Sequence, residues 1–200
     1  MKLMLLVVAM LLIPMVDQTL SPAERDHAVA ELESSRKAFL EATSGLSEAQ
    51  WNFKPAPDRW SIAECAEHIG VTEAYILSLI TEQALKGPAE PEKRAQVQGK
   101  DTSMMAMAVD RSTKFKAPEP IQPTRRWVTS GEITKNVLEN RARTIAFVNT
   151  TQEDLRDHFM DHPVFKTLDT YQWILLTSAH MRRHTAQILE VKADPNFPKR

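Results

Sequence analysis

The stretch from residue 173 to residue 191 constrains the fold of this chain more than any other. It contains no glycine or proline, so it is expected to form a helix. At 100° per residue, one stripe of that helix carries Trp173, Leu176, Thr177, His180, His184, Gln187, Ile188 and Val191. A mainly apolar stripe faces the core of a globular protein. We therefore predict a long core-facing helix with two histidines on its buried side.

These two histidines, His180 and His184, are four residues apart. Side chains at this spacing lie one turn apart on the same helix face, where two imidazoles can bind one metal ion. The third ligand would come from a facing helix, and His68 is the best candidate because it lies at the edge of another apolar arc. A histidine at that place is, taken alone, more often a hydrogen-bonded core residue. The pair on the later helix favours the metal-site interpretation.

Three further helices are expected, from about 22 to 44, 62 to 86 and 131 to 149, the last of them capped by Ser130. The first two begin with the capping boxes Ser21-Pro-Ala-Glu24 and Ser61-Ile-Ala-Glu64, and Asp169 caps the helix that carries the two histidines. The chain has only five glycines in 200 residues, which also favours helix. Four capped helices with one apolar stripe each predict an all-α fold, a four-helix bundle.

The second and third helices are separated by a long connection from Pro88 to about Thr129, which contains five prolines. A crossover of this length is expected where two consecutive helices of a bundle run parallel. Loops this long in small domains are usually functional or held by their own side chains. We expect the methionines near residue 105 to form a short helical turn over the bundle and Trp127 to dock the end of the loop.

Four residues are candidates for supporting roles around the three histidines. Gln187 lies one turn beyond His184 and could orient its ring. Glu64 lies one turn before His68 and is a candidate acid or base, although a capping role explains it equally well. Trp60 is either a core plug at one end of the bundle or part of a ligand pocket. His162 could line the mouth of a pocket, but Pro163 disfavours a helical pairing with His158.

Two residues have simpler explanations. We interpret Arg141, inside an apolar stripe, as a surface arginine whose aliphatic stem covers apolar surface. Pairing with an acid or with an anionic ligand is the alternative. Cys65, the only cysteine, is interpreted as a small buried filler, with a metal ligand or a reactive thiol as alternatives.

The N-terminus resembles a secretory signal peptide. Lys2 precedes fourteen uncharged, mostly apolar residues, a run that is short for a membrane span of about 20 residues. An A-x-A-like cleavage site is missing, so an uncleaved anchor and a packed N-terminal helix stay open. We assign residues 1–19 to this leader and residues 20–200 to the bundle. The protein is exported, to the periplasm or the extracellular space, if the leader is cleaved, and otherwise cytoplasmic or membrane-anchored.

Composition excludes some partners. The formal net charge is −1, with 25 lysines and arginines against 26 acidic residues, so nothing drives binding to a nucleic-acid backbone. We expect no nucleic-acid partner, no membrane span in the mature protein and a small-molecule substrate of unidentified chemistry. A homodimer is compatible with such a bundle.

Several motifs together resemble a known family. They are Trp60-Ser-Ile-Ala-Glu-Cys-Ala-Glu-His68-Ile, Asp110-Arg-Ser with Ala117-Pro-Glu-Pro120, His162-Pro-Val-Phe165, and His180-Met-Arg-Arg-His184-Thr-Ala-Gln187-Ile. In combination they resemble the DinB-like superfamily over residues 24 to 198. That family includes damage-inducible proteins, thiol-dependent S-transferases and mycothiol-dependent maleylpyruvate isomerases.

The resemblance implies a four-helix bundle with a long crossover and a divalent metal, zinc or nickel, on His68, His180 and His184. The chemistry it implies is that of a metal-dependent enzyme, either a thiol-dependent transferase or a hydrolase. The alternative is a non-catalytic helical bundle that binds a metal or a small molecule. A closed site with four protein ligands would favour that alternative, and an open site favours catalysis.

Overall fold

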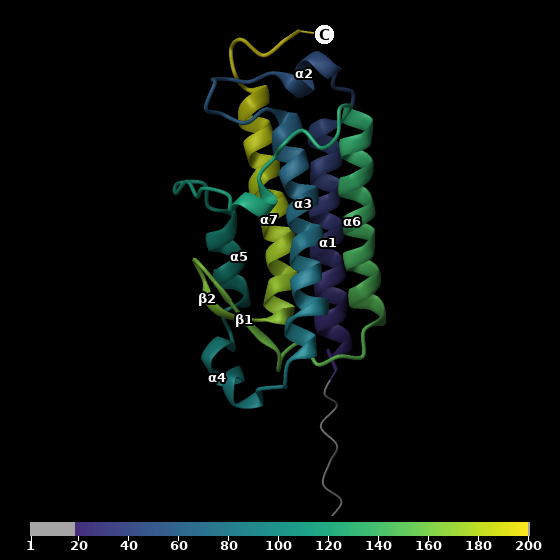
Figure 1. Cartoon of the computed structure of the whole chain (residues 1–200), viewed down its shortest axis with the longest axis vertical. Helices are drawn as coiled ribbons and strands as arrows, with labels where there is room; N and C mark the ends of the chain where they lie inside the picture. The colour runs from purple at the N-terminus through teal and green to yellow at the C-terminus, as the bar shows by residue number, and fades with distance from the viewer. Residues whose placement is uncertain (1–18, 200) are drawn as a thin grey trace, which may run out of the picture.

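The structure, a computed structural model, describes residues 19–199 and consists mainly of four long helices packed side by side (Figure 1). They are α1 (Pro22–Thr43), α3 (Ile62–Glu82), α6 (Ser130–Thr150) and α7 (Thr170–Lys192). The predicted all-α four-helix bundle is confirmed. Almost the whole predicted leader lies outside the described residues. None of the helices that the structure describes is long and apolar enough to cross a membrane.

Each of the four long helices begins with a complete capping box. Ser21, Ser61 and Asp169 are the expected caps, and each side chain accepts a hydrogen bond from the backbone N–H three residues later. The third helix differs by one position, because Thr129 is its cap and Ser130 its first residue. Such caps satisfy backbone donors that have no partner within the helix.

The bundle combines parallel and antiparallel neighbours. Helices α3 and α6 are parallel, because Asn140 donates to the Gly70 carbonyl and the next contact along both helices joins Arg141 to Glu73. Helices α1 and α7 are also parallel, since their contacts advance together from Glu24 with Tyr171 to Ala42 with Lys192. A parallel pair of consecutive helices requires a long connection, as the crossover predicted.

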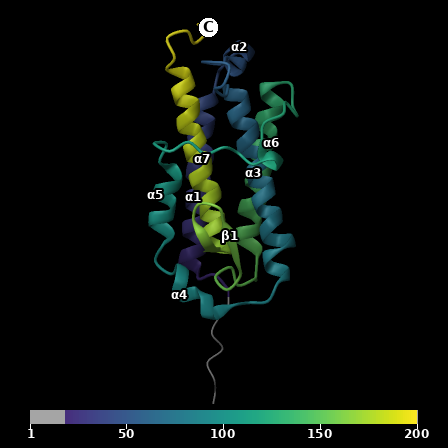
Figure 2. The same ribbon diagram turned by 60° about the vertical axis from the view of Figure 1, so that its left-hand side comes forward.

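The crossover between α3 and α6 contains short helices. They are η1 (Ala84–Lys86), η2 (Pro91–Lys93), α4 (Arg94–Val97), α5 (Asp101–Val109) and η3 (Glu119–Ile121). The predicted methionine-rich turn is the nine-residue helix α5, which packs along the outside of α7 (Figure 2). Trp127 packs against the core, as expected.

The end of the crossover is held by a buried carboxylate. Glu67 of α3 is 2% exposed and accepts hydrogen bonds from the backbone N–H groups of Thr124, Arg125 and Arg126. The Arg126 guanidinium lies 2.9 Å from the same carboxylate. The loop is therefore fixed beside His68, the next residue of α3.

Two smaller elements close the ends of the bundle. Helix α2 (Glu48–Asn52) covers the end where α3 begins, and its Trp51 is buried in the core. An antiparallel hairpin of β1 (Phe159–His162) and β2 (Lys166–Asp169) precedes α7. The hairpin was not expected from the sequence, because its strands are only four residues each.

Helix α7 lies at the centre of the contacts, since it packs against α1, α3 and α5. All ten consecutive residues from 170 to 179 are buried, so this part of the helix is covered on every side and not only along the single stripe that was predicted. The additional cover comes from α5, of which the sequence predicted only a short helical turn over the bundle. A central helix of this kind loses most of its apolar surface from water, which stabilises the bundle by about 25 cal/mol for each Å² buried.

The interpretation of Arg141 as a surface residue is wrong. Its side chain is 0% exposed and forms an ion pair of 2.9 Å with Glu73, itself 3% exposed. The guanidinium also donates to the carbonyls of Leu32 and Thr177 and to the Ser35 hydroxyl. The alternative of pairing with an acid applies, and the buried pair joins α3 and α6 inside the core.

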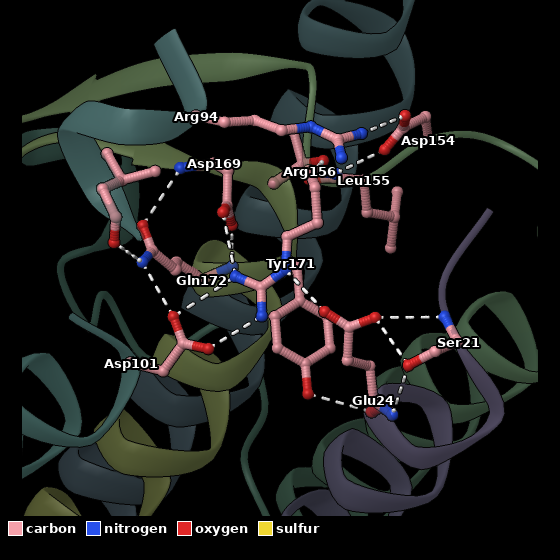
Figure 3. A network of polar contacts seen from close by, with 12 residues as sticks. Ser21, Glu24, Arg94, Asp101, Asp154, Leu155, Arg156, Asp169, Tyr171 and Gln172 are labelled. Carbon is pink, nitrogen blue, oxygen red and sulfur yellow. Dashed lines mark hydrogen bonds and ion pairs between the residues drawn. The ribbon is translucent and has the colours of Figure 1, made fainter. Parts of the chain in front are cut away.

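A second arginine organises the end of the bundle where α1 and α7 begin (Figure 3). Arg156 lies between three carboxylates, those of Glu24, Asp101 and Asp169, at distances of 2.8–2.9 Å. Its guanidinium also lies 4.0 Å from the centre of the Tyr171 ring. These contacts join the first turns of α1, α5 and α7 and so fix where the histidine-bearing helix begins.

Candidate metal centre

His68 projects from α3 toward α7 and is 3% exposed. Its Nδ1 lies 2.7 Å from the backbone carbonyl oxygen of Ile121 in η3. A carbonyl can only accept, so Nδ1 carries the proton of the neutral ring and Nε2 keeps a free lone pair. This Nε2 points to the two histidines of α7.

His180 and His184 meet that nitrogen from the other side. The Nε2 atoms of His180 and His68 are 3.0 Å apart. One ring nitrogen from each of the three histidines lies within 4.8 Å of the other two. The three rings therefore converge, as expected from the spacing of His180 and His184 and from the position of His68 on a facing helix. In the part of the chain that the structure describes, this is the only such cluster of histidine, cysteine and acidic side chains.

Burial controls the protonation of the three rings. The pKa of His68 is lowered chiefly because the ring is buried. The pKa values of His180 and His184 are held well below the ordinary value, first by burial and then by the charges of neighbouring rings and arginines. Desolvation disfavours the charged form of an imidazole. All three rings are therefore neutral near pH 7, which is the state that binds a metal ion.

Two of the predicted supporting residues lie at the site. Gln187 accepts a hydrogen bond at its Oε1 from Nδ1 of His184, at 2.9 Å. Trp60 packs against the rings of His68 and His184, with centroid distances of 4.9 and 5.9 Å. Trp60 also packs on the core, which is one of the two roles that the sequence offered, and its ring contacts place it beside the three histidines.

The other candidates lie elsewhere. Glu64 completes the capping box of α3 and forms an ion pair with Lys54, so its contacts are those of a capping residue. His162 lies in the hairpin against Phe165 and Trp173, where burial lowers its pKa to about 4. Its ring contacts none of the three histidines in the described structure. Cys65 is fully buried in the core, and burial raises the pKa of its thiol.

Two contributors from the crossover were not predicted from the sequence. One is the Ile121 carbonyl, which no side-chain pattern could show. The other is Arg111, whose Nη1 lies 3.3 Å from Gln187 Oε1 and whose Nε and Nη2 pair with Glu190 at 2.6 and 2.7 Å. Arg111 belongs to the Asp110-Arg-Ser motif that carries part of the family resemblance, and this motif was the available signal.

The distances fit a metal ion. Metal–nitrogen bonds of about 2.1 Å place two ligands of one ion about 3.0–3.4 Å apart at angles of 90–109°. The 3.0 Å between the Nε2 atoms of His68 and His180 lies at the lower end of that range. Three neutral imidazoles form a donor set that suits divalent transition metals.

Comparison with known proteins agrees with the resemblance. A model of the DinB superfamily matches residues 31–188. The chain belongs to the DinB superfamily. Over 148 residues this DinB protein is 29% identical to uncharacterized protein YuaE of Bacillus subtilis (strain 168). The aligned part covers 74% of the chain and 86% of YuaE.

A solved structure shares the fold. YfiT from Bacillus subtilis, described as a probable metal-dependent hydrolase with an unusual four-helix bundle topology, superposes with a TM-score of 0.53. The match covers 87% of this DinB protein and 89% of YfiT at 15% identity. At that identity the comparison supports the bundle architecture alone.

Proposed function

We propose that this DinB protein is a metal-dependent enzyme, a hydrolase or a thiol-dependent transferase, whose divalent cation is held by His68, His180 and His184. Zinc and nickel are the two candidates, because both accept three imidazole ligands. The proposal rests on the three converging rings and agrees with the description of YfiT as a probable metal-dependent hydrolase.

One observation carries the proposal. His68 Nε2 has a free lone pair, because Nδ1 donates to Ile121, and it faces His180 Nε2 at 3.0 Å. Buried lone pairs at this distance need a proton or a cation between them. A proton shared by two rings would leave the buried imidazole of His184 without a function in the cluster. A cation engages all three.

The surrounding residues are arranged for a bound ion. The Ile121 carbonyl and the Gln187 amide oxygen hold the outer nitrogens of His68 and His184, as partners of metal-ligating histidines commonly do. Trp60 packs against both rings and shields the cluster from water on one side. A bound divalent cation supplies Lewis acidity and lowers the pKa of a water molecule or thiol that it coordinates.

The ligand number favours catalysis over a structural role. Structural zinc sites are usually closed by four protein ligands, whereas catalytic sites keep a position for water or substrate. Among the described residues, no cysteine, carboxylate or fourth histidine joins the cluster.

The first test is metal stoichiometry. We expect protein purified without chelator, or reloaded with zinc or nickel ions, to hold one ion per chain by elemental analysis. His68→Ala, His180→Ala and His184→Ala should each reduce binding strongly, while His162→Ala serves as a matched control in which a partly buried histidine outside the cluster is removed. Equal loss in the control, or full metal content in the triad variants, would contradict the site.

The second test is activity. The loaded protein is screened against esters, amides and electrophiles, with and without low-molecular-weight thiols. Turnover that requires both the ion and a thiol identifies a transferase, and turnover with water alone identifies a hydrolase. Stoichiometric metal without turnover on any class would favour the non-catalytic alternative.

A further inference from the structure

We infer that Arg111, supplied by the crossover, is a positioning residue that selects the metal-binding tautomer of His184 by fixing the orientation of the Gln187 amide. The inference rests on the proposed function, since it concerns how the candidate metal centre is prepared. It assigns a role to an arginine that lies outside the three-histidine cluster.

The Gln187 amide faces two groups with the same oxygen. Oε1 lies 2.9 Å from His184 Nδ1 and 3.3 Å from Arg111 Nη1. An amide has an accepting end and a donating end that differ little in shape, so its orientation is decided by its partners. His184 cannot decide it, because a neutral imidazole can donate or accept at Nδ1, depending on its tautomer.

Arg111 removes this ambiguity. A guanidinium has five N–H donors and no acceptor, so only the oxygen of the amide can face it. Once Oε1 is fixed between Arg111 and His184, Nδ1 of His184 must carry the proton. The lone pair of the ring is then on Nε2, the nitrogen left to bind an ion.

Arg111 is itself held firmly. Its Nε and Nη2 pair with both oxygens of Glu190, one turn beyond Gln187 on α7, at 2.6 and 2.7 Å. A bidentate ion pair of this kind fixes the plane of the guanidinium. A lysine at this position could not form a bidentate pair. The chain of contacts therefore runs from Glu190 through Arg111 and Gln187 to His184.

His68 is oriented by the same segment in a simpler way. Its Nδ1 is fixed by the Ile121 carbonyl, a group that can only accept. The crossover thus sets the tautomer of one ligand with a backbone oxygen and of another through an arginine. This explains why Arg111 has to act through an amide, because an arginine placed directly on His184 would select the opposite tautomer at Nδ1.

The test uses Arg111→Met, with Arg111→Lys as the conservative variant and Arg59→Met as the matched control. Arg59 lies 3.9 Å from Glu190 and has no contact with Gln187, so the control removes the same charge from the same neighbourhood. The first readout is ¹⁵N NMR of metal-free protein labelled at histidine. In the wild type and in Arg59→Met we expect a protonated Nδ1 and a bare Nε2 at His184, and in Arg111→Met a mixture of tautomers.

The second readout is zinc affinity, measured by competition with a chromophoric chelator. Loss of an outer partner of a ligating histidine typically costs 10–100-fold in metal affinity. We expect a loss of about tenfold in Arg111→Met, partial recovery in Arg111→Lys and little change in Arg59→Met. An unchanged Nδ1 signal together with unchanged zinc affinity in Arg111→Met would overturn the inference.

A background substitution separates tautomer selection from a merely structural effect. In Gln187→Glu both side-chain ends are oxygens, so His184 Nδ1 is protonated whichever way the group is turned. We therefore expect Arg111→Met to lose little zinc affinity in that background. A loss as large as in the Gln187 protein would mean that Arg111 acts by supporting the fold, and the inference would be wrong. If the wild type shows the expected tautomer and binds neither zinc nor nickel, the proposed function fails and the tautomer assignment stands.

Discussion

Removing the Arg141 guanidinium should destabilise the bundle far more than removing any surface charge of the same helix. Arg141→Met leaves the Glu73 carboxylate buried beside Thr144, with no cation in contact. Desolvating a charge without a partner is costly, whereas a methionine fills most of the space of the lost side chain.

The size of the expected loss in the free energy of unfolding follows from how completely the two side chains are buried. Arg141 is 0% exposed and Glu73 is 3% exposed, so water cannot replace either partner. Breaking such a pair by removing one member costs about 3–5 kcal/mol. At about 2–4 °C for each kcal/mol in a chain of this size, the melting temperature should fall by about 6–20 °C.

Replacing both partners should restore most of that loss. In the double variant Glu73→Leu with Arg141→Met neither charge of the pair is left, and the Ser35 hydroxyl still donates to the Leu32 carbonyl at 3.0 Å. Buried pairs replaced by apolar residues of similar volume are often neutral or more stable. The double-mutant cycle should therefore give a coupling energy of at least about 2 kcal/mol.

Urea unfolding of the four proteins of the cycle, followed by circular dichroism, measures these free energies. Arg143→Met is the matched control, since Arg143 is an exposed arginine on α6 that donates to Asn140. Its loss should stay within about 0.5 kcal/mol. If Arg141→Met costs as little as Arg143→Met, the pair is not buried as described and the reasoning fails.

Three other predictions concern the site and the N-terminus. A bound ion at a hundredfold excess over its Kd should add about 2.7 kcal/mol to the free energy of unfolding, so a chelator should lower the melting temperature of metal-loaded protein. His184→Ala should abolish that response, and a chelator effect that persists in the variant would contradict the assignment. In metal-free protein the pKa values of the three histidines are lowered, so the unfolded chain binds more protons than the folded chain below about pH 6.5. The free energy of unfolding should therefore keep the whole contribution of these histidines above about pH 6.5 and decrease as the pH falls below that value. Equal urea midpoints at pH 5 and pH 8 would contradict this. We also propose that the leader is cleaved, so protein from the native host should begin after about residue 19 by N-terminal sequencing. Cytosolic protein with an intact Met1 would refute export.

The helices could be predicted because their signals are local. A capping box such as Ser61 with Glu64 occupies four consecutive residues, and an apolar stripe depends only on the geometry of one helix. The hairpin before α7 lacked such signals, and only a short turn was expected where the nine-residue helix α5 lies. Their strands and turns are short, and their apolar residues are buried because distant helices cover them.

The candidate site likewise combines residues that a local pattern predicts with contacts that only the folded chain creates. His180 and His184 share one helix face, so their convergence follows from their spacing alone, and His68 could be added because a metal needs a third ligand. The partners of Arg141 and His184 could not be found in this way. Glu73 meets Arg141 only because α3 and α6 run parallel in a particular register, and Arg111 meets Gln187 only because the crossover returns over α7.

The crossover therefore has two consequences that depend on each other. A short loop between α3 and α6 would force these helices to run antiparallel and would bring different residues opposite Glu73. The same loop would be too short to pass over the junction of α3 and α7, where Ile121 and Arg111 reach His68 and Gln187. The parallel direction of α3 and α6 and the orientation of the candidate ligands thus have one cause, which is the length and path of residues 83–129. Shortening this segment should disturb the bundle register and the site together, whereas a change at Arg111 alone should affect only the site.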